Sequence, residues 1–182
     1  MIPPQPGDVG LVSIKGAVGV LIRVGQWLNS DGFHDYQHAF VVVDGLEDVH
    51  SRFAEQSGIG LVEAQPGGAI LAPLSKYDGR DVVYLRCPDQ YRPAVAKAAR
   101  ELLGTPYSFL DYLSLAARRL HIPAPHLREY IRSSGHLICS QLADRAAMLG
   151  GWHLFSDGRW EGDVTPGDLY QLYREQQRQV AS

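Results

Sequence analysis

Residues 135–151, GHLICSQLADRAAMLGG, place one of the chain's two cysteines at the start of a predicted amphipathic helix. Three apolar residues then share one side of this helix: Leu142, Ala146 and Leu149. At the first helical turn, the free backbone N–H groups and the positive end of the helix dipole favour a thiolate. The same N–H groups can hold the oxyanion of a tetrahedral intermediate. Cys139 is therefore a candidate nucleophile; the alternative is a small buried hydrophobic residue, the usual role of a free cysteine.

A cysteine nucleophile needs a base, and the chain contains seven histidines. His38 differs from the others because it opens the apolar run HAFVVV, where a strand would fix its direction and let the ring point off the sheet's end. The alternative is a strand-end histidine that is hydrogen-bonded to a loop. His34 lies four residues earlier, but the glycine and aspartates around it argue against a helical metal-binding pair. We expect neither a metal nor another cofactor.

The base in turn needs an acceptor that orients it. Glu63 lies in GLVEAQP among apolar neighbours, where a carboxylate is costly to bury unless it is paired. If the strands at 38–43 and 61–65 are neighbours, Glu63 is placed to accept the second ring N–H of His38. The alternative is a glutamate at a strand edge that faces water.

The elements that must position these residues change in type along the chain. Five segments have the β-branched composition and turn signals of strands: 7–14, 38–45, 60–68, 69–74 and 81–88. Helical spacing and capping residues predict five helices: 17–29, 92–104, 108–120, 139–149 and 165–177. Between residues 38 and 88 the strands follow one another without a helix, which favours antiparallel pairing. The order predicts a single α+β domain over residues 1–182.

Composition excludes several classes of function. The formal net charge of −3 leaves no basic surplus to bind phosphates, so we expect no nucleic-acid partner. The early apolar run at 9–28 is interrupted by charges and glycines, so we predict no transmembrane segment. The first ten residues, MIPPQPGDVG, lack the basic region of a secretory signal, which predicts a cytoplasmic protein as synthesised. The sequence does not indicate an oligomeric state.

Taken in order, several motifs resemble a known enzyme family: PGDVGLV, YQHAFVVVDG, LVEAQPGGAILAPL, VVYLRCP, LLGTPYSFLDYL and LICSQLADRAAMLG. Their order is similar to that of the permuted NlpC-type cysteine peptidases and amidases of the papain-like superfamily, in which the histidine strand precedes the cysteine helix. The resemblance covers roughly residues 7–172. It implies a circularly permuted papain-like fold, an antiparallel sheet packed against helices.

By this resemblance Cys139 is the nucleophile, His38 the base and Glu63 the residue that orients the base. Tyr107 in GTPY matches a tyrosine that the family often keeps near the site, and it is a candidate oxyanion or substrate contact; the alternative is ordinary packing of a tyrosine after a proline. Phe40 departs from the small residue more frequent there; it would either narrow the site or pack in the core. Cys87 matches no catalytic position and is expected to be structural.

The resemblance implies a thiol hydrolase, an amidase or peptidase, with a peptide or acyl-amide substrate such as a cell-wall peptide. Without a signal peptide, such an enzyme would reach the wall by lysis, specialised export or a phage particle. Two alternatives stay open: a thiol acyltransferase or thioesterase acting on lipid or acyl groups, and a non-catalytic binding or structural module. Four arginines in segment 117–136 would form a basic wall, a lid above the thiol or solvated helix faces.

Overall fold

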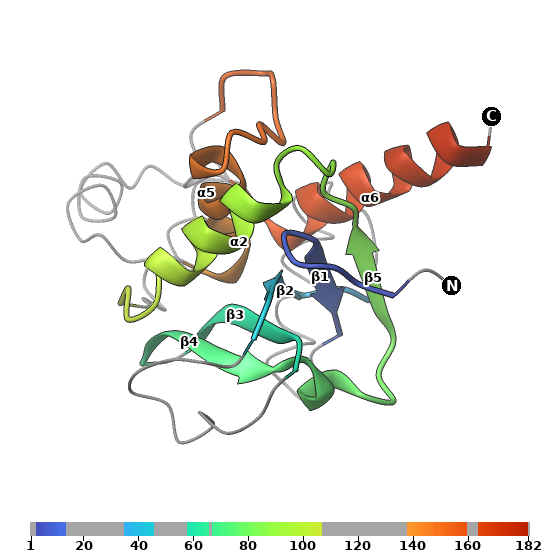
Figure 1. The fold of residues 1–182 in the computed structure, drawn as a ribbon. Helices are drawn as coiled ribbons and strands as arrows, with labels where there is room; N and C mark the ends of the chain where they lie inside the picture. Colours follow the sequence, from blue (N-terminus) through green and yellow to red (C-terminus); the bar gives the residue numbers. More distant parts are fainter. Residues whose placement is uncertain are drawn as a thin grey trace, which may run out of the picture.

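The computed structural model describes residues 3–13, 35–45, 58–65, 67–106, 138–159 and 164–181. Within these ranges, five strands form one sheet in the order β4-β3-β2-β1-β5, and every neighbouring pair is antiparallel (Figure 1). The strands are β1 (Val9–Val12), β2 (His38–Val43), β3 (Gly60–Gln65), β4 (Gly68–Pro73) and β5 (Val82–Leu85). The expected strands and their antiparallel pairing are therefore confirmed.

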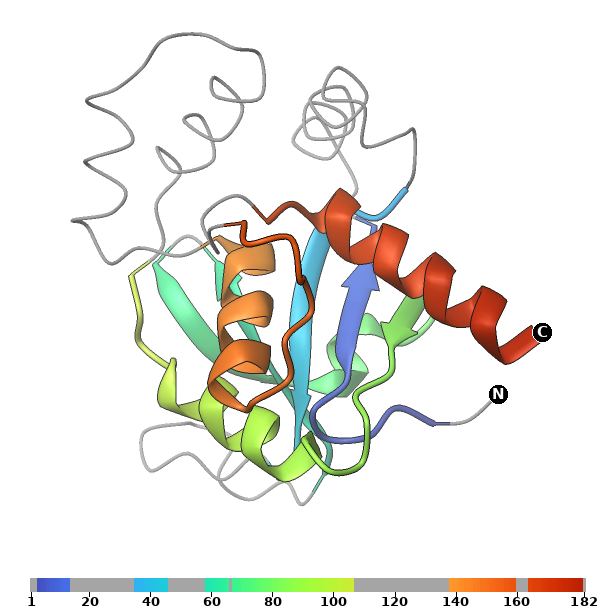
Figure 2. The ribbon, with the colours of Figure 1, turned by 90° about the horizontal axis from the view of Figure 1, so that it is seen from above.

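Three helices and one short 3-10 turn accompany this sheet in the described part of the chain: α2 (Arg92–Glu101), α5 (Cys139–Leu149), α6 (Pro166–Ala181) and η1 (Leu74–Tyr77). Helices α2 and α5 pack against each other and against β2, on one face of the sheet (Figure 2). Helix α6 contacts β5 and β1 instead. The helices expected at 92–104, 139–149 and 165–177 are confirmed, and those expected at 17–29 and 108–120 lie outside the described residues.

Local sequence explains where α6 begins and where α5 ends. The Oγ1 atom of Thr165 accepts the N–H of Asp168 at 3.1 Å, and the Asp168 carboxylate accepts the Thr165 N–H at 2.8 Å. This reciprocal pair satisfies donors that a helix start otherwise leaves open. Helix α5 ends at a pair of glycines, of which Gly151 has a φ of 82°. A Cβ on Gly150 would lie 2.5 Å from a methyl carbon of Val95, so glycine allows α5 to approach α2 closely.

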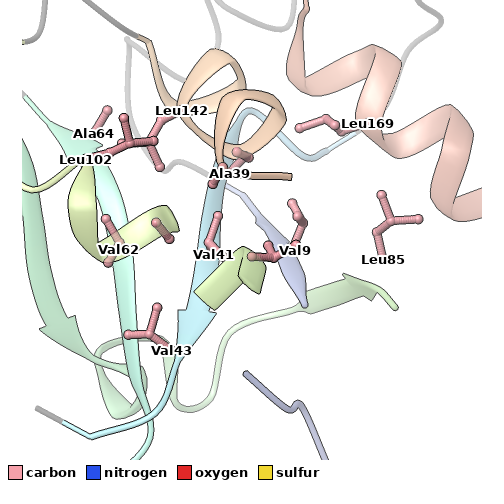
Figure 3. Packing of buried hydrophobic residues seen from close by; sticks show 14 of the residues in the cluster. Val9, Ala39, Val41, Val43, Val62, Ala64, Leu85, Leu102, Leu142 and Leu169 are labelled. Carbon is pink, nitrogen blue, oxygen red and sulfur yellow. The ribbon is translucent and has the colours of Figure 1, made fainter. Parts of the chain in front are cut away.

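Alternation along β2 divides the core between the two faces of the sheet. Every residue of β2 is buried. On the helix-covered face, Val41 and Val62 pack with Leu142 of α5 in the main cluster (Figure 3). On the other face, Phe40 packs with Leu61 and other residues of a second, smaller cluster. Because the side chains of a strand point alternately to opposite faces, a strand buried along its whole length must be covered on both sides.

The apolar side of α5 is buried over most of its length. Leu142 and Ala146 are fully buried, as their spacing predicts. Leu149, at the last position of the helix, is 56% exposed. A residue's angular position on a helix fixes only the direction of its side chain, and burial also requires a packing partner at that height.

One buried carboxylate connects the start of the chain to β5 and α2. Asp8 is fully buried and accepts hydrogen bonds from the guanidinium groups of Arg86 and Arg92, each at 2.7 Å. Its oxygens also accept the backbone N–H groups of Cys87 and Gln5, both at 3.0 Å. The two ion pairs and two backbone bonds compensate the cost of removing this carboxylate from water.

The described elements define a mixed α+β fold in which a five-stranded antiparallel sheet packs against helices. Across the described ranges, no helix combines the length and the apolar character needed to cross a membrane. The circularly permuted papain-like arrangement implied by the resemblance stays a prediction.

Candidate active site

The thiol of Cys139 lies where strands β2 and β3 separate. Pairing between these strands ends at Val41 and Val62, although β2 begins at His38 and β3 continues to Gln65. Cys139 is the first residue of α5, which contacts both strands, and it is partly exposed. The end of the ladder leaves backbone groups of β2 available for the sulfur of the cysteine.

His38 stands between the thiol and a carboxylate. Its Nε2 lies 2.7 Å from Oε2 of Glu63, and its ring is also hydrogen-bonded to the side chain of Cys139. Because Nε2 is engaged by the glutamate, Nδ1 is the nitrogen left for the sulfur. A histidine that donates through one nitrogen to a carboxylate presents the other to a nucleophile, as in a catalytic triad.

Glu63 is completely buried and has a hydrogen-bond donor at each of its lone-pair positions. Oε2 accepts from His38 and from the hydroxyl of Tyr77, the latter at 2.6 Å. Oε1 accepts from the side-chain amide of Gln65 at 2.8 Å and from Nζ of Lys76. The sequence-based alternative, a strand-edge glutamate facing water, is therefore wrong.

Electrostatics favours the charged forms of both His38 and Glu63. Burial on its own would lower the pKa of His38, but the adjacent Cys139 and Glu63 raise this pKa to about 9. Burial would raise the pKa of Glu63, but hydrogen bonds and charge from His38, together with Lys76 and Tyr77, lower it to about 2. The carboxylate is thus ionised at neutral pH, and the imidazole tends to be protonated.

The same pairing stabilises Cys139 as a thiolate. Burial raises the pKa of this thiol, but the charge and hydrogen bond of His38 outweigh it, and the net pKa is lowered. The backbone N–H groups of Ala39 and Ser140 also hydrogen-bond to the sulfur and lower the pKa further. Ala39 lies in the part of β2 beyond its ladder with β3. Together these groups favour a thiolate–imidazolium pair.

The second cysteine has the opposite environment. Cys87 is 1% exposed, and its sulfur lies 3.5 Å from the carbonyl oxygen of Pro88. Burial raises the pKa of its thiol to about 12, despite a lowering effect of Arg92. A thiol with this pKa is almost entirely protonated at neutral pH, so Cys87 is suited to a structural role in the core rather than to reaction as a nucleophile.

The structure brings together the three residues that the sequence singled out, and it settles the position of Phe40. Phe40 is fully buried, and its ring stacks on that of Tyr77 with centroids 5.1 Å apart. It therefore packs in the core rather than narrowing the site. Tyr107 and segment 117–136 lie outside the described residues.

Sequence reasoning missed the other donors to Glu63. Gln65 lies two residues after Glu63, so the period of a strand already put both side chains on one face. Lys76 and Tyr77 belong to η1, and no local pattern in PLSKYDG links them to a glutamate thirteen and fourteen residues earlier. Their role depends on the β3–β4 hairpin and is visible only in three dimensions.

Among the described residues, no group of three or more histidine, cysteine, aspartate or glutamate side chains is arranged to hold a metal ion. No protein-family model matches the sequence, and no curated protein matches it. The function of the chain is therefore inferred from the side chains of this site and from the sequence resemblance.

Proposed function

We propose that the protein is a thiol hydrolase, an amidase or peptidase, in which Cys139 is the nucleophile, His38 the general base and acid, and Glu63 the residue that orients His38. The observation that carries the proposal is the position of His38, which is bonded to the thiol of a partly exposed cysteine on one side and to a buried carboxylate on the other. A structural cysteine has no need of such a pair.

The chemistry follows from the ionisation of this pair. The Cys139 thiolate attacks the carbonyl carbon of an amide, and a carbon–sulfur bond forms as the carbonyl oxygen becomes an oxyanion. Collapse of this intermediate breaks the carbon–nitrogen bond, and protonated His38 gives its proton to the leaving amine. His38 then removes a proton from water, which attacks the thioester and releases the acid and the thiol.

The oxyanion needs donors that are fixed before the reaction starts. The backbone N–H of Cys139 is at the first helical position, where the helix offers it no carbonyl partner. The sulfur and this N–H belong to one residue, so an oxygen on the attacked carbon falls close to the helix start. The positive end of the α5 dipole supports the developing negative charge.

The resemblance to permuted NlpC-type enzymes extends the proposal to fold and substrate. It is consistent with a circularly permuted papain-like domain, since the histidine strand β2 precedes the cysteine helix α5. It favours peptidoglycan stem peptides as substrates. The alternative is an acyl-directed enzyme, and Phe40, which is fully buried and stacked on Tyr77, is not placed to line a pocket for an acyl group.

The test is hydrolysis of purified muropeptides and, in parallel, of acyl-thioesters by the full chain. We expect release of a new amine from a muropeptide, and we expect Cys139→Ala and His38→Gln to reduce the rate by a factor of about 10³ or more. The matched control is Cys87→Ala, which removes the other thiol.

Three outcomes have different meanings. Turnover of acyl-thioesters but not muropeptides would move the proposal to the acyl-directed alternative. Turnover that survives Cys139→Ala would overturn the assigned nucleophile. Absence of turnover, combined with slow alkylation of Cys139, would favour a non-catalytic module.

A further inference from the structure

The four donors around Glu63 come from two different sources. His38 and Gln65 belong to the strands β2 and β3, whereas Lys76 and Tyr77 are adjacent residues of η1. Each carboxylate oxygen receives one donor from the strands and one from η1. The short turn η1 therefore supplies a donor to each oxygen of the Glu63 carboxylate, and the other two donors come from the sheet.

The Tyr77 hydroxyl is held in place by the strand that carries the histidine. The ring of Tyr77 is 7% exposed and stacks on Phe40, two residues after His38 in β2. The Tyr77 and His38 rings have centroids 6.4 Å apart. Burial and the neighbouring Glu63 raise the pKa of the Tyr77 hydroxyl, so this group stays a donor. Its bond to Oε2 and the bond from His38 share one oxygen.

Sharing a carboxylate between donors has a consequence for His38. Each hydrogen bond or cation on Glu63 takes up part of the negative charge that would otherwise stabilise an imidazolium. Lys76 adds a positive charge on Oε1, and Tyr77 adds a donor on Oε2 itself. These two residues thus restrain the position of Glu63 and at the same time weaken its attraction for the proton on His38.

From this arrangement we propose that Lys76 and Tyr77 are positioning residues of the hydrolase. They orient the Glu63 carboxylate toward His38 and lower the proton affinity of the His38 imidazole. This proton is transferred to the leaving amine in each turnover. The inference rests on the proposed function, because a proton on His38 matters only if Cys139 reacts. It assigns to η1 a role that the triad alone does not include.

The test compares Tyr77→Phe with Tyr84→Phe in the full chain. Tyr77→Phe keeps the ring on Phe40 and removes only the hydroxyl from Glu63. Tyr84 also contacts Phe40, edge-on with centroids 6.2 Å apart, but it donates no hydrogen bond to Glu63. The readout is the midpoint of His38 ionisation, followed by the ring-nitrogen chemical shifts as pH rises. His38→Gln identifies the signal, and no substrate is needed.

We expect the His38 midpoint to move to higher pH in Tyr77→Phe and to stay unchanged in Tyr84→Phe. Lys76→Met should move it in the same direction, while Lys97→Met, which changes an exposed lysine of α2, should not. Glu63→Gln should move the midpoint to lower pH, since it removes the charge itself. On a substrate that is turned over, kcat of Tyr77→Phe should fall about tenfold with little change in KM.

Two results separate this inference from the proposed function. If Glu63→Gln lowers the midpoint but Tyr77→Phe and Lys76→Met leave it unchanged or lower it, the inference is overturned and the triad stands. If Glu63→Gln also leaves the His38 midpoint unchanged, both the proposed triad and the inference are overturned. A merely structural role of Tyr77 would lower stability without raising the midpoint.

Discussion

The two cysteines of the chain allow one prediction to be worked out within a single molecule. Cys87 has a pKa of about 12, so at pH 7 about one molecule in 10⁵ carries a thiolate there. The pKa of Cys139 lies below the ordinary value of 9.0, so more than about one molecule in 10² carries a thiolate at this site. The thiolate populations therefore differ by a factor of about 10³ or more.

The intrinsic nucleophilicity of a thiolate falls with its pKa, and this partly offsets the difference in population. With a Brønsted coefficient of about 0.5, each unit of pKa gap reduces the reactivity of the weaker base about threefold, whereas each unit changes the thiolate population about tenfold while the pKa lies above the ambient pH. The net expectation is that Cys139 reacts at least about 10 times faster than Cys87 at pH 7. The burial of Cys87, which is 1% exposed, increases this ratio further.

The assay is partial alkylation of the native protein with limiting iodoacetamide, followed by denaturation, a second isotopic label and tryptic digestion. Cys139 lies in the peptide 133–145, and Cys87 lies in 87–97, because the bond between Arg92 and Pro93 resists trypsin. The ratio of the two labels gives both rates from one sample.

The control for simple exposure is His38→Gln, which leaves Cys139 at the same helix start but removes its ion-pair partner. In this variant the labelling of Cys139 at pH 7 should fall markedly, while that of Cys87 stays the same. Equal labelling of the two cysteines in the wild-type protein would refute the reasoning, and so would fast labelling of Cys139 that does not depend on His38.

Three further predictions concern stability. Gly10→Ala should lower the free energy of unfolding by about 3 kcal/mol in chemical denaturation, because a Cβ there would lie 2.1 Å from the ring of Phe40. An unchanged denaturation midpoint would contradict this packing. Asp8→Ala should cost about 3–5 kcal/mol, since two arginines lose their buried partner, and high salt should rescue little of it. The Glu63 pKa is lowered from 4.5 to about 2, so this carboxylate contributes about 3 kcal/mol that is present above pH 4.5 and is lost as pH falls toward 2. Unfolding free energies of the wild type and Glu63→Gln should therefore converge in acid, and a constant difference between them would contradict the lowered pKa.

Local signals in the sequence predicted much of the fold. The β-branched run after His38 and the Thr165–Asp168 capping pair act within a few residues, so their outcome depends little on distant parts of the chain. The helix predicted over 139–149 has the same bounds in the structure. The contact between His38 and Glu63 was predicted from strand adjacency, and it is present at 2.7 Å.

Other features depend on tertiary contacts that no local pattern encodes. The hydrogen bond from the Ala39 N–H to the sulfur joins β2, beyond its ladder with β3, to the start of α5, a hundred residues later in the chain. The hydrogen bonds from Lys76 and Tyr77 to the Glu63 carboxylate depend on the β3–β4 hairpin. The exposure of Leu149 likewise depends on how far the packed surface extends along α5. The assigned catalytic roles stay predictions.

The central claim is that Cys139 forms a covalent thioester with an acyl group and that His38 makes this possible. Its most direct test is the mass of the full chain after brief mixing and acid quenching with a muropeptide, an activated ester or an acyl-thioester. The triad predicts an added acyl group located in the peptide 133–145, retained in Cys87→Ala and lost in Cys139→Ala and His38→Gln. An unmodified chain with all three substrates, or an acyl group that forms equally well in His38→Gln, would contradict the claim.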